Sequence, residues 1–267
     1  MPIQTLTTWL GLPAFALASV MFLMTFRAGP SRQVLLTRAA LTSFVVGALA
    51  CTLALFGQAS ADDTGTLLAT CLAWLTVGAY VKWKLKPLGA LVAPLVTLLL
   101  LVQSFAIPSL RAGSTETPSA ALAAVHVTAA VLGQTFAIGA CAVSVFYLWS
   151  RNALKRRQLG QLPAQVPAID KLERLLTLLL WSGFIFITAG LVTGALHVQQ
   201  QGVLAGTRLE AKVVWAIAVW LWYLATLIAR NVLNHPGKRI AQMSLGGFAL
   251  MAVAYFGMAF FRAPGSM

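Results

Sequence analysis

Histidine is the residue type in this chain best suited to bind a metal, and it occurs three times, at His126, His197 and His235. The three cysteines lie in apolar runs without a CxxC or CxxCH motif, so the sequence predicts neither a disulfide framework nor a covalently attached cofactor. It shows no Ser-His-Asp set, phosphate-binding loop or pair of buried carboxylates, and we therefore expect a binding protein rather than an enzyme. What the histidines could bind depends on the elements that carry them.

The composition excludes a soluble protein. Of the 267 residues, 59% are hydrophobic and 9% are charged, whereas soluble domains have about 45–50% and about 25%. So few charged side chains cannot cover the surface of a water-soluble domain. Lipid must therefore be the solvent for most of the chain.

Eight apolar stretches are long enough to cross a membrane as helices. A hydrocarbon core of about 30 Å needs roughly 20 residues, because each residue of a helix rises about 1.5 Å. The sequence thus predicts an all-α, polytopic integral membrane protein, a bundle of about eight transmembrane helices. The third stretch is short and carries several polar residues, so a seven-span protein is the alternative. The predicted spans are residues 7–26, 37–58, 66–82, 87–106, 119–150, 172–198, 210–233 and 243–262.

The basic residues divide unevenly between the two sets of loops that these spans create. Fifteen of the 19 lysine and arginine residues fall on one side. Basic loops stay in the cytoplasm, so this side is predicted to be cytoplasmic and both termini to point outward (N-out/C-out). The formal net charge of +13 then lies on the cytoplasmic face, where anionic lipid explains it better than nucleic acid does. The fifteen are Arg27, Arg32, Arg38, Lys82, Lys84, Lys86, Arg151, Lys155, Arg156, Arg157, Lys171, Arg174, Arg230, Lys238 and Arg239.

Two of the histidines are expected at one depth in the membrane. His126 lies near the outer end of the fifth predicted span, and His197 lies at the outer end of the sixth. Two neutral imidazoles on facing helices are what bis-histidine ligation of haem iron requires. The alternative for each is a hydrogen bond to a neighbouring helix or to water. His235 falls in a cytoplasmic turn and is expected to be a turn residue.

Small residues predict that these two helices pack side by side. Ala129, Gly133 and Ala137 recur at every fourth position of the fifth span, and Gly190 and Gly194 do the same on the sixth. Small side chains at this spacing let two helix backbones approach closely.

A series of short motifs occupies residues 120–260. They are His126 with residues 127–130, Phe146-Tyr147-Leu148, residues 154–157, Leu172-Glu173-Arg174-Leu175, residues 188–194, residues 215–220 with Tyr223, Ala229-Arg230, Gly237-Lys238-Arg239 and Ala254-Tyr255-Phe256-Gly257. In these motifs the chain resembles the membrane family of cytochrome c assembly proteins, which includes the CcsA/ResC proteins and the shorter, eight-span HemX-like and YpjD-like proteins. It is most similar to the short YpjD-like branch. The first four spans match the family in length and placement only.

The resemblance implies a multi-pass protein of the bacterial inner (plasma) membrane, with haem handling or cytochrome c biogenesis as its theme. It also implies a single membrane domain over residues 1–267, with a variable four-span half at 1–110 and a cytochrome c assembly-like half at 119–262. His126 matches a histidine of the family, and His197 lies beside a family ligand position. Haem-delivering members carry a tryptophan-rich external segment, which is missing from residues 199–208 here.

We therefore predict a haem-associated inner-membrane protein of cytochrome c assembly type, a binding or accessory factor with His126 and His197 as candidate ligands of the haem iron. Its partners would be the lipid bilayer and a protein of cytochrome biogenesis or the haem pathway. One alternative is a cofactor-free, HemX-like regulatory scaffold that holds a partner through the basic residues at 151–157. A small-solute transporter is a weaker alternative, because no Asp, Glu, Lys or Arg lies deep inside a span.

Overall fold

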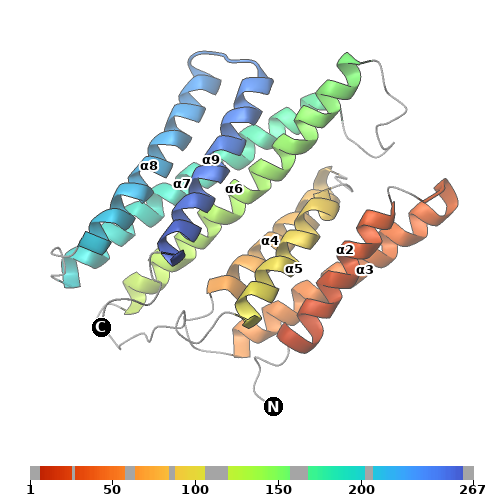
Figure 1. Cartoon of the computed structure of the whole chain (residues 1–267), viewed down its shortest axis with the longest axis horizontal. Helices are drawn as coiled ribbons and strands as arrows, with labels where there is room; N and C mark the ends of the chain where they lie inside the picture. The colour runs from red at the N-terminus through yellow and green to blue at the C-terminus, as the bar shows by residue number, and fades with distance from the viewer. Residues whose placement is uncertain are drawn as a thin grey trace. The chain divides into compact units, whose positions relative to one another are not determined.

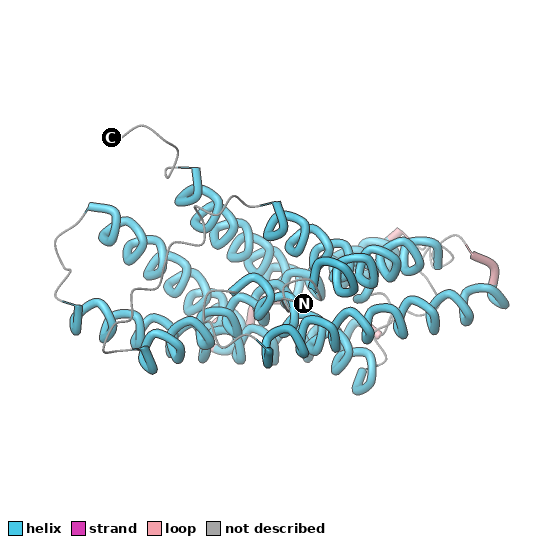
Figure 2. The backbone as a smooth tube through the Cα atoms, turned by 90° about the horizontal axis from the view of Figure 1, so that it is seen from below, coloured by secondary structure: helices cyan, strands magenta, loops and turns pink. Residues whose placement is uncertain are grey.

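The structure is a computed structural model that describes residues 7–25, 28–57, 64–83, 88–105, 120–156, 168–201 and 207–260. Within these ranges nearly every residue is helical and there is no strand (Figure 2). The chain starts with a π-helical turn, η1 (Thr7–Gly11). Eight α-helices follow, one at each predicted span (Figure 1). They are α2 (Leu12–Thr25), α3 (Pro30–Gly57), α4 (Thr64–Trp83), α5 (Leu88–Phe105), α6 (Ala120–Lys155), α7 (Ile169–Gln201), α8 (Thr207–Asn231) and α9 (Gly237–Phe260).

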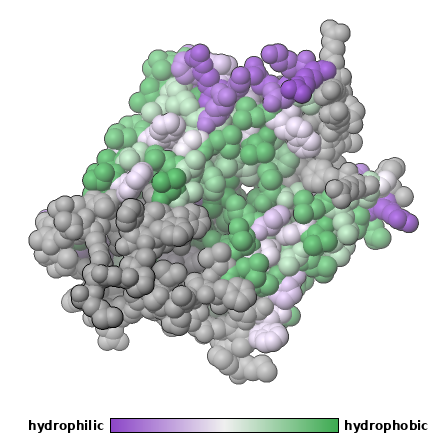
Figure 3. Space-filling model, viewed as in Figure 1, coloured by the Kyte–Doolittle hydropathy of each residue, from purple (hydrophilic) through white to green (hydrophobic). Residues whose placement is uncertain are grey.

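Several of these helices are suited to lipid, which makes the chain a multi-pass membrane protein. Five stretches among the described residues are long and apolar enough to cross a membrane: Arg32–Phe56, Thr64–Lys82, Ala121–Lys155, Ile169–Gln199 and Val213–Asn231. The second of them, Thr64–Lys82, is the short stretch that does not cross the membrane in the seven-span alternative. Hydrophobic side chains cover the flanks of the helices, whereas hydrophilic ones gather at the end where α8 meets α9 (Figure 3). Exposed apolar side chains of this kind are expected to face lipid.

The chain divides into two compact units. The first comprises residues 1–117 and 149–171, and the second comprises residues 118–148 and 172–267. The break after residue 117 falls between the two predicted halves, although the end of α6 and the start of α7 group with the first unit. That the two units form a single membrane domain stays a prediction. Arg27, Lys84, Lys86 and Arg157 lie outside the described residues.

Aromatic rings pack the core of the first unit. Phe44 of α3 meets Phe15 and Phe22 of α2 edge-on, with ring centroids 5.0 and 6.3 Å apart. Two glycines make room for these rings: Gly47 of α3 lies against Phe15, and Gly89 of α5 lies against Phe22. Edge-to-face pairs of this kind add about 0.5–1.5 kcal/mol beyond the area that they bury.

Hydroxyl groups join the helices of the first unit, as expected where lipid offers no hydrogen bonds. Ser43 Oγ of α3 donates to the carbonyl oxygen of Ala14 on α2 at 2.7 Å. Ser19 of α2 and Thr97 of α5 share a hydrogen bond of 3.1 Å between their hydroxyl oxygens. Trp74 Nε1 of α4 donates to Thr52 Oγ1 of α3 at 3.0 Å.

We expect Gly89→Ala to destabilise the first unit. The new Cβ would lie 2.6 and 2.8 Å from two atoms of the buried Phe22 ring, and closer still to a third. Overpacking of this kind costs about 1–3 kcal/mol. Thermal unfolding in mild detergent measures the effect, and Gly78→Ala on α4 is the matched control.

A Cβ at Gly78 meets nothing within 4 Å, so its only effect is a gain in helix propensity of up to about 1 kcal/mol. The two substitutions should therefore shift the melting temperature in opposite directions. Equal shifts would mean that Phe22 does not fill the space beside Gly89.

The second unit is held together by tryptophans of α8. Trp220 stacks on Phe184 of α7 with ring centroids 5.8 Å apart, and its Nε1 donates to Thr188 Oγ1 at 3.0 Å. On the other side, Trp222 Nε1 donates to the carbonyl oxygen of Met243 on α9 at 2.8 Å. These contacts join α8 to both α7 and α9.

Candidate functional site

His126 is bound to the neighbouring helix. It lies in the second turn of α6, half-buried, and its Nδ1 is 2.8 Å from the carbonyl oxygen of Gly190 on α7. A carbonyl oxygen can only accept, so Nδ1 must carry the proton. In the neutral imidazole, Nε2 is then left with a free lone pair. This is the form in which a histidine binds a metal through Nε2, with its other nitrogen held by a second group.

A second glycine of α7, Gly194, provides the surface against which this ring packs. We call Gly194 and the carbonyl oxygen of Gly190 the seat of the imidazole. A Cβ at Gly194 would lie 2.7 Å from Cε1 and 2.9 Å from Nδ1 of His126, but 3.5 Å from Nε2. The imidazole therefore rests its Cε1–Nδ1 edge on the α7 backbone, and Nε2 is the ring nitrogen farther from it. Only glycine allows this approach, because any side chain would occupy the space of the ring.

The predicted packing of α6 against α7 is confirmed. Gly133 lies against Ile187, Gly190 against Ala130, and Gly183 against Phe136 and Ala137. Phe136 and Phe186 also stack, with ring centroids 5.6 Å apart. The small residues thus set the register of two antiparallel helices that are in direct contact.

This register places the second predicted ligand. Gly183, Ile187, Gly190 and Gly194 form the stripe of α7 that faces α6, and His197 continues it at the same spacing. The register puts His197 opposite residue 123, three residues or about 4.5 Å beyond the level of His126, which is slightly less than one turn. The two histidines therefore lie at the same end of the α6–α7 pair, but one turn apart rather than level.

His235 lies at the other end of the second unit. Its backbone N–H donates to the carbonyl oxygen of Ala229 at 2.9 Å, within the turn that joins α8 to α9. The preceding residue, Asn234, has a positive φ of 47°, a conformation that asparagine tolerates better than most residues. This agrees with the expected role of a turn residue.

Among the described residues, no group of three or more His, Cys, Asp or Glu side chains could hold a metal ion. A metal site built from protein ligands alone is therefore not seen in this part of the chain. Haem iron requires fewer protein ligands, because the porphyrin supplies four nitrogens and the protein supplies only one or two axial ligands. His126, with its fixed tautomer, fits that requirement.

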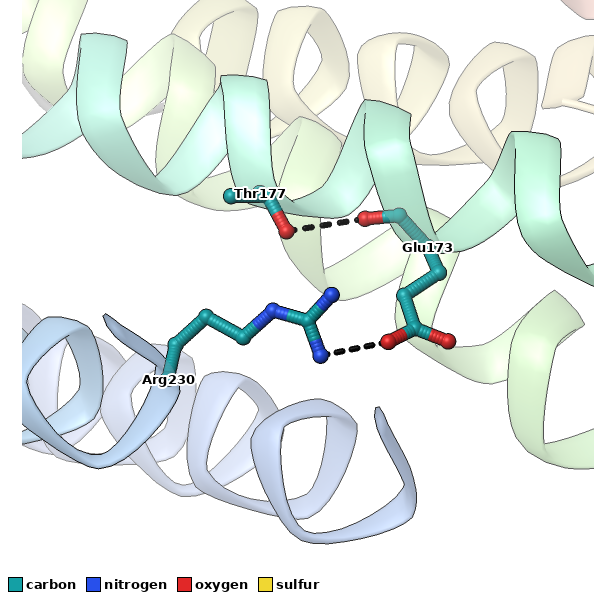
Figure 4. A network of polar contacts seen from close by, with 3 residues as sticks. All are labelled: Glu173, Thr177 and Arg230. Atoms are coloured by element: carbon teal, nitrogen blue, oxygen red, sulfur yellow. Dashed lines mark hydrogen bonds and ion pairs between the residues drawn. The ribbon is translucent and has the colours of Figure 1, made fainter. Parts of the chain in front are cut away.

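A polar cluster closes the opposite end of the second unit. Arg230 near the end of α8 forms an ion pair with Glu173 near the start of α7 (Figure 4). Both side chains are about three-quarters buried, with 25% and 26% of their surface exposed. Thr177 Oγ1 donates to the backbone carbonyl oxygen of Glu173 at 2.9 Å. The ion pair between Arg230 and Glu173 therefore joins α7 to α8.

The first residue of α9 is packed into the same cluster. A Cβ at Gly237 would lie 2.8 Å from Glu173 Oε2 and would collide with Tyr147 Oη of α6. Tyr147 is buried. The cluster of Tyr147, Glu173, Arg230 and Gly237 thus brings together α6, α7, α8 and α9 at one point.

Sequence reasoning found these four residues as parts of motifs but not as a cluster. Arg230 appeared as a basic residue of the predicted cytoplasmic side and in the Ala229-Arg230 motif, and Glu173 appeared only in the Leu172-Glu173-Arg174-Leu175 motif. One feature of the sequence could have indicated the ion pair. Glu173 and Arg230 each lie within one helical turn of the end of an apolar stretch, where burying a paired charge costs little free energy. Their pairing depends on the antiparallel register of α7 and α8.

Comparison with known proteins assigns the chain to a family. The family described as cytochrome c assembly protein matches residues 61–263, which include α4 to α9. This chain belongs to the cytochrome c assembly family. The match begins well before residue 120, so it extends beyond the motifs of the second half into the first. His126, Gly190 and Gly194 lie inside it, and so does the cluster of Tyr147, Glu173, Arg230 and Gly237.

Curated relatives in this family carry the name cytochrome c biogenesis protein CcsA. The protein from Prochlorococcus marinus strain MIT 9312 is 30% identical over 100 residues, which are 37% of this chain and 31% of that protein. The one from Prochlorococcus marinus subsp. pastoris is 34% identical over 80 residues, which are 29% of this chain and 24% of that protein. The chain thus aligns with less than a third of these relatives' length. No solved structure gives a significant match.

Proposed function

We propose that this chain is a haem-binding or accessory factor of cytochrome c assembly in the bacterial inner membrane. The observation that carries the proposal is the hydrogen bond between His126 Nδ1 and the Gly190 carbonyl oxygen, which leaves Nε2 available to iron. Family membership and the names of the relatives support the same role. The partner would be another protein of cytochrome biogenesis.

In this proposal all eight α-helices cross the membrane and both termini lie outside. The second unit supports this orientation. Arg174, Arg230 and Lys238 lie at the end where α7 begins, α8 ends and α9 begins. His126 and His197 lie at the opposite end. Basic residues favour the cytoplasmic side, so in this proposal the histidines lie on the outer side.

Haem would be held by His126, through its Nε2, and by His197. The iron would supply a site that binds neutral imidazoles, and the chain would supply the orientation of the ring. Toward the middle of the membrane, the contacts of Gly190 with Ala130 and of Gly133 with Ile187 close the seam between α6 and α7. The residues that would hold haem, His126 and His197, are on the outward side of these contacts, and His197 lies farther out on the same stripe.

The test is a visible spectrum of the full chain purified in mild detergent, with and without added haem. We expect a Soret band that His126→Ala abolishes and His197→Ala shifts or weakens. His235→Ala is the matched control and should leave the band unchanged, because His235 lies in the turn at the other end. A folded protein with no histidine-dependent band would refute haem binding and favour the cofactor-free scaffold.

A further inference from the structure

The carbonyl oxygen of Gly190 has a second side-chain donor besides His126. Thr193 Oγ1 of α7 lies 3.2 Å from this oxygen and 2.7 Å from the carbonyl oxygen of Ala189, so its hydroxyl can donate to either. Nδ1 of His126 lies 2.8 Å from the same oxygen of Gly190. The threonine and the histidine therefore reach one acceptor from two different helices.

The contact of Thr193 with Gly190 is additional to the ordinary bond of a helical threonine. That bond goes to the carbonyl oxygen four residues earlier, as Thr177 makes to Glu173 and Thr188 makes to Phe184. Thr193 makes it too, to Ala189. Its second contact falls on the oxygen that fixes the tautomer of His126.

More donors meet at this oxygen than it has lone pairs. A carbonyl oxygen carries two lone pairs. Because α7 continues to Gln201, its helical ladder directs the backbone N–H of Gly194 to the oxygen of Gly190. The Nδ1–H group of His126 and the hydroxyl of Thr193 are the second and third donors. Donors that share one acceptor weaken one another, because each draws on the same electron density.

We propose that Thr193 is a positioning residue of the haem site, which weakens the hydrogen bond between His126 and Gly190 and so limits how strongly His126 binds iron. The consequence at iron rests on the proposed function, whereas the competition for the carbonyl oxygen does not. A stronger bond at Nδ1 raises the basicity of Nε2 and makes the imidazole a better ligand for ferric iron. Thr193 would thereby make bound haem easier to reduce and to release.

Proton and nitrogen NMR of the haem-free full chain in mild detergent tests the hydrogen bond. The signal of the His126 Nδ1 proton moves downfield as its bond to Gly190 strengthens. Thr193→Val replaces the hydroxyl by a methyl group of similar size and should move this signal downfield, and Thr193→Ala should move it in the same direction. Thr193→Ser keeps a hydroxyl and should leave the signal near its position in the unmodified chain.

Thr177→Val is the matched control. Thr177 also lies on α7 and donates to a carbonyl oxygen of its own helix, but it does so near the other end, at Glu173. This variant should leave the His126 signal unchanged. A signal that stays in place or moves upfield in Thr193→Val would overturn the proposal, and so would an equal shift in Thr177→Val.

The reduction potential of the haem-loaded chain is the readout at iron. Thr193→Val should lower the potential, because a stronger bond at Nδ1 favours ferric iron, and Thr193→Ser should keep it near that of the unmodified chain. An unchanged potential despite a shifted NMR signal would overturn the role of Thr193 in the haem site. Failure of the proposed function looks different: neither the unmodified chain nor a variant would retain haem, and the role at iron would fall, while the downfield shift in Thr193→Val would still be seen.

Discussion

Gly194→Ala is expected to unseat His126 and to weaken haem retention by about tenfold or more, the usual effect of losing a group that orients a metal ligand. The new methyl group would overlap Cε1 and Nδ1 of the imidazole, which lie 2.7 and 2.9 Å from its position. The ring would have to leave the carbonyl oxygen of Gly190, and Nε2 would lose its fixed direction. The intensity of the Soret band per protein measures this loss.

Gly190→Ala is the matched control on the same helix. Its Cβ would meet Ala130 at 3.4 Å, which is ordinary contact, and the carbonyl oxygen that binds His126 would remain. This variant should therefore keep most of the band. Similar losses in both variants would indicate that helix packing, rather than the seat of the imidazole, controls retention.

A nitrogen NMR measurement tests the seat without haem. With only three histidines, ¹⁵N-labelled imidazoles can be assigned by substitution. His126 should show a protonated Nδ1 and an unprotonated Nε2, and Gly194→Ala should remove this preference. If His126 in the unmodified chain shows the opposite tautomer, the bond to Gly190 is not the one that orients the ring.

Arg230→Ala is expected to lower the stability of the second unit by about 1–3 kcal/mol, because it leaves the Glu173 carboxylate mostly buried without its charged partner. The carboxylate also lies against Gly237 at the start of α9, so the loss should loosen more than one helix junction. Thermal unfolding in detergent gives the magnitude. Limited proteolysis in the α8–α9 turn gives the location.

Arg174→Ala is the control for charge, since Arg174 neighbours Glu173 but is exposed. It should change stability little. The double variant Glu173→Gln with Arg230→Gln should recover part of the loss, because it removes both charges together. An Arg230→Ala variant as stable as Arg174→Ala would show that the ion pair does not hold the cluster.

The helices were predictable because lipid imposes a simple rule on the sequence. A stretch must be apolar over about 20 residues and must satisfy its own backbone, so length and composition place the helices. The short third stretch illustrates this, since Thr64–Lys82 still meets the requirement despite its polar residues. Helix ends were less predictable: α3 begins at Pro30 and α6 continues to Lys155, because helices extend into the interface beyond the apolar stretch.

The candidate site was predictable only in part. Topology assigned His126 and His197 to the same end of two neighbouring helices, and glycine spacing indicated that these helices pack closely. The sequence could not show that Gly194 receives the ring, or that the carbonyl oxygen of Gly190 selects its tautomer. Both depend on the rotation of α6 about its axis, and small residues on either side of the seam allow more than one rotation.

The sequence by itself determined that lipid is the solvent of this protein, where the described helices lie along the chain, and which imidazoles are available to a metal. It did so because these properties follow from composition and from the order of residues along the chain. Only the tertiary structure decided which nitrogen of His126 is free, that His197 lies one turn beyond it, and that Glu173 finds Arg230. Those outcomes depend on distances of a few ångströms between helices that are remote in sequence, and such distances are set by packing.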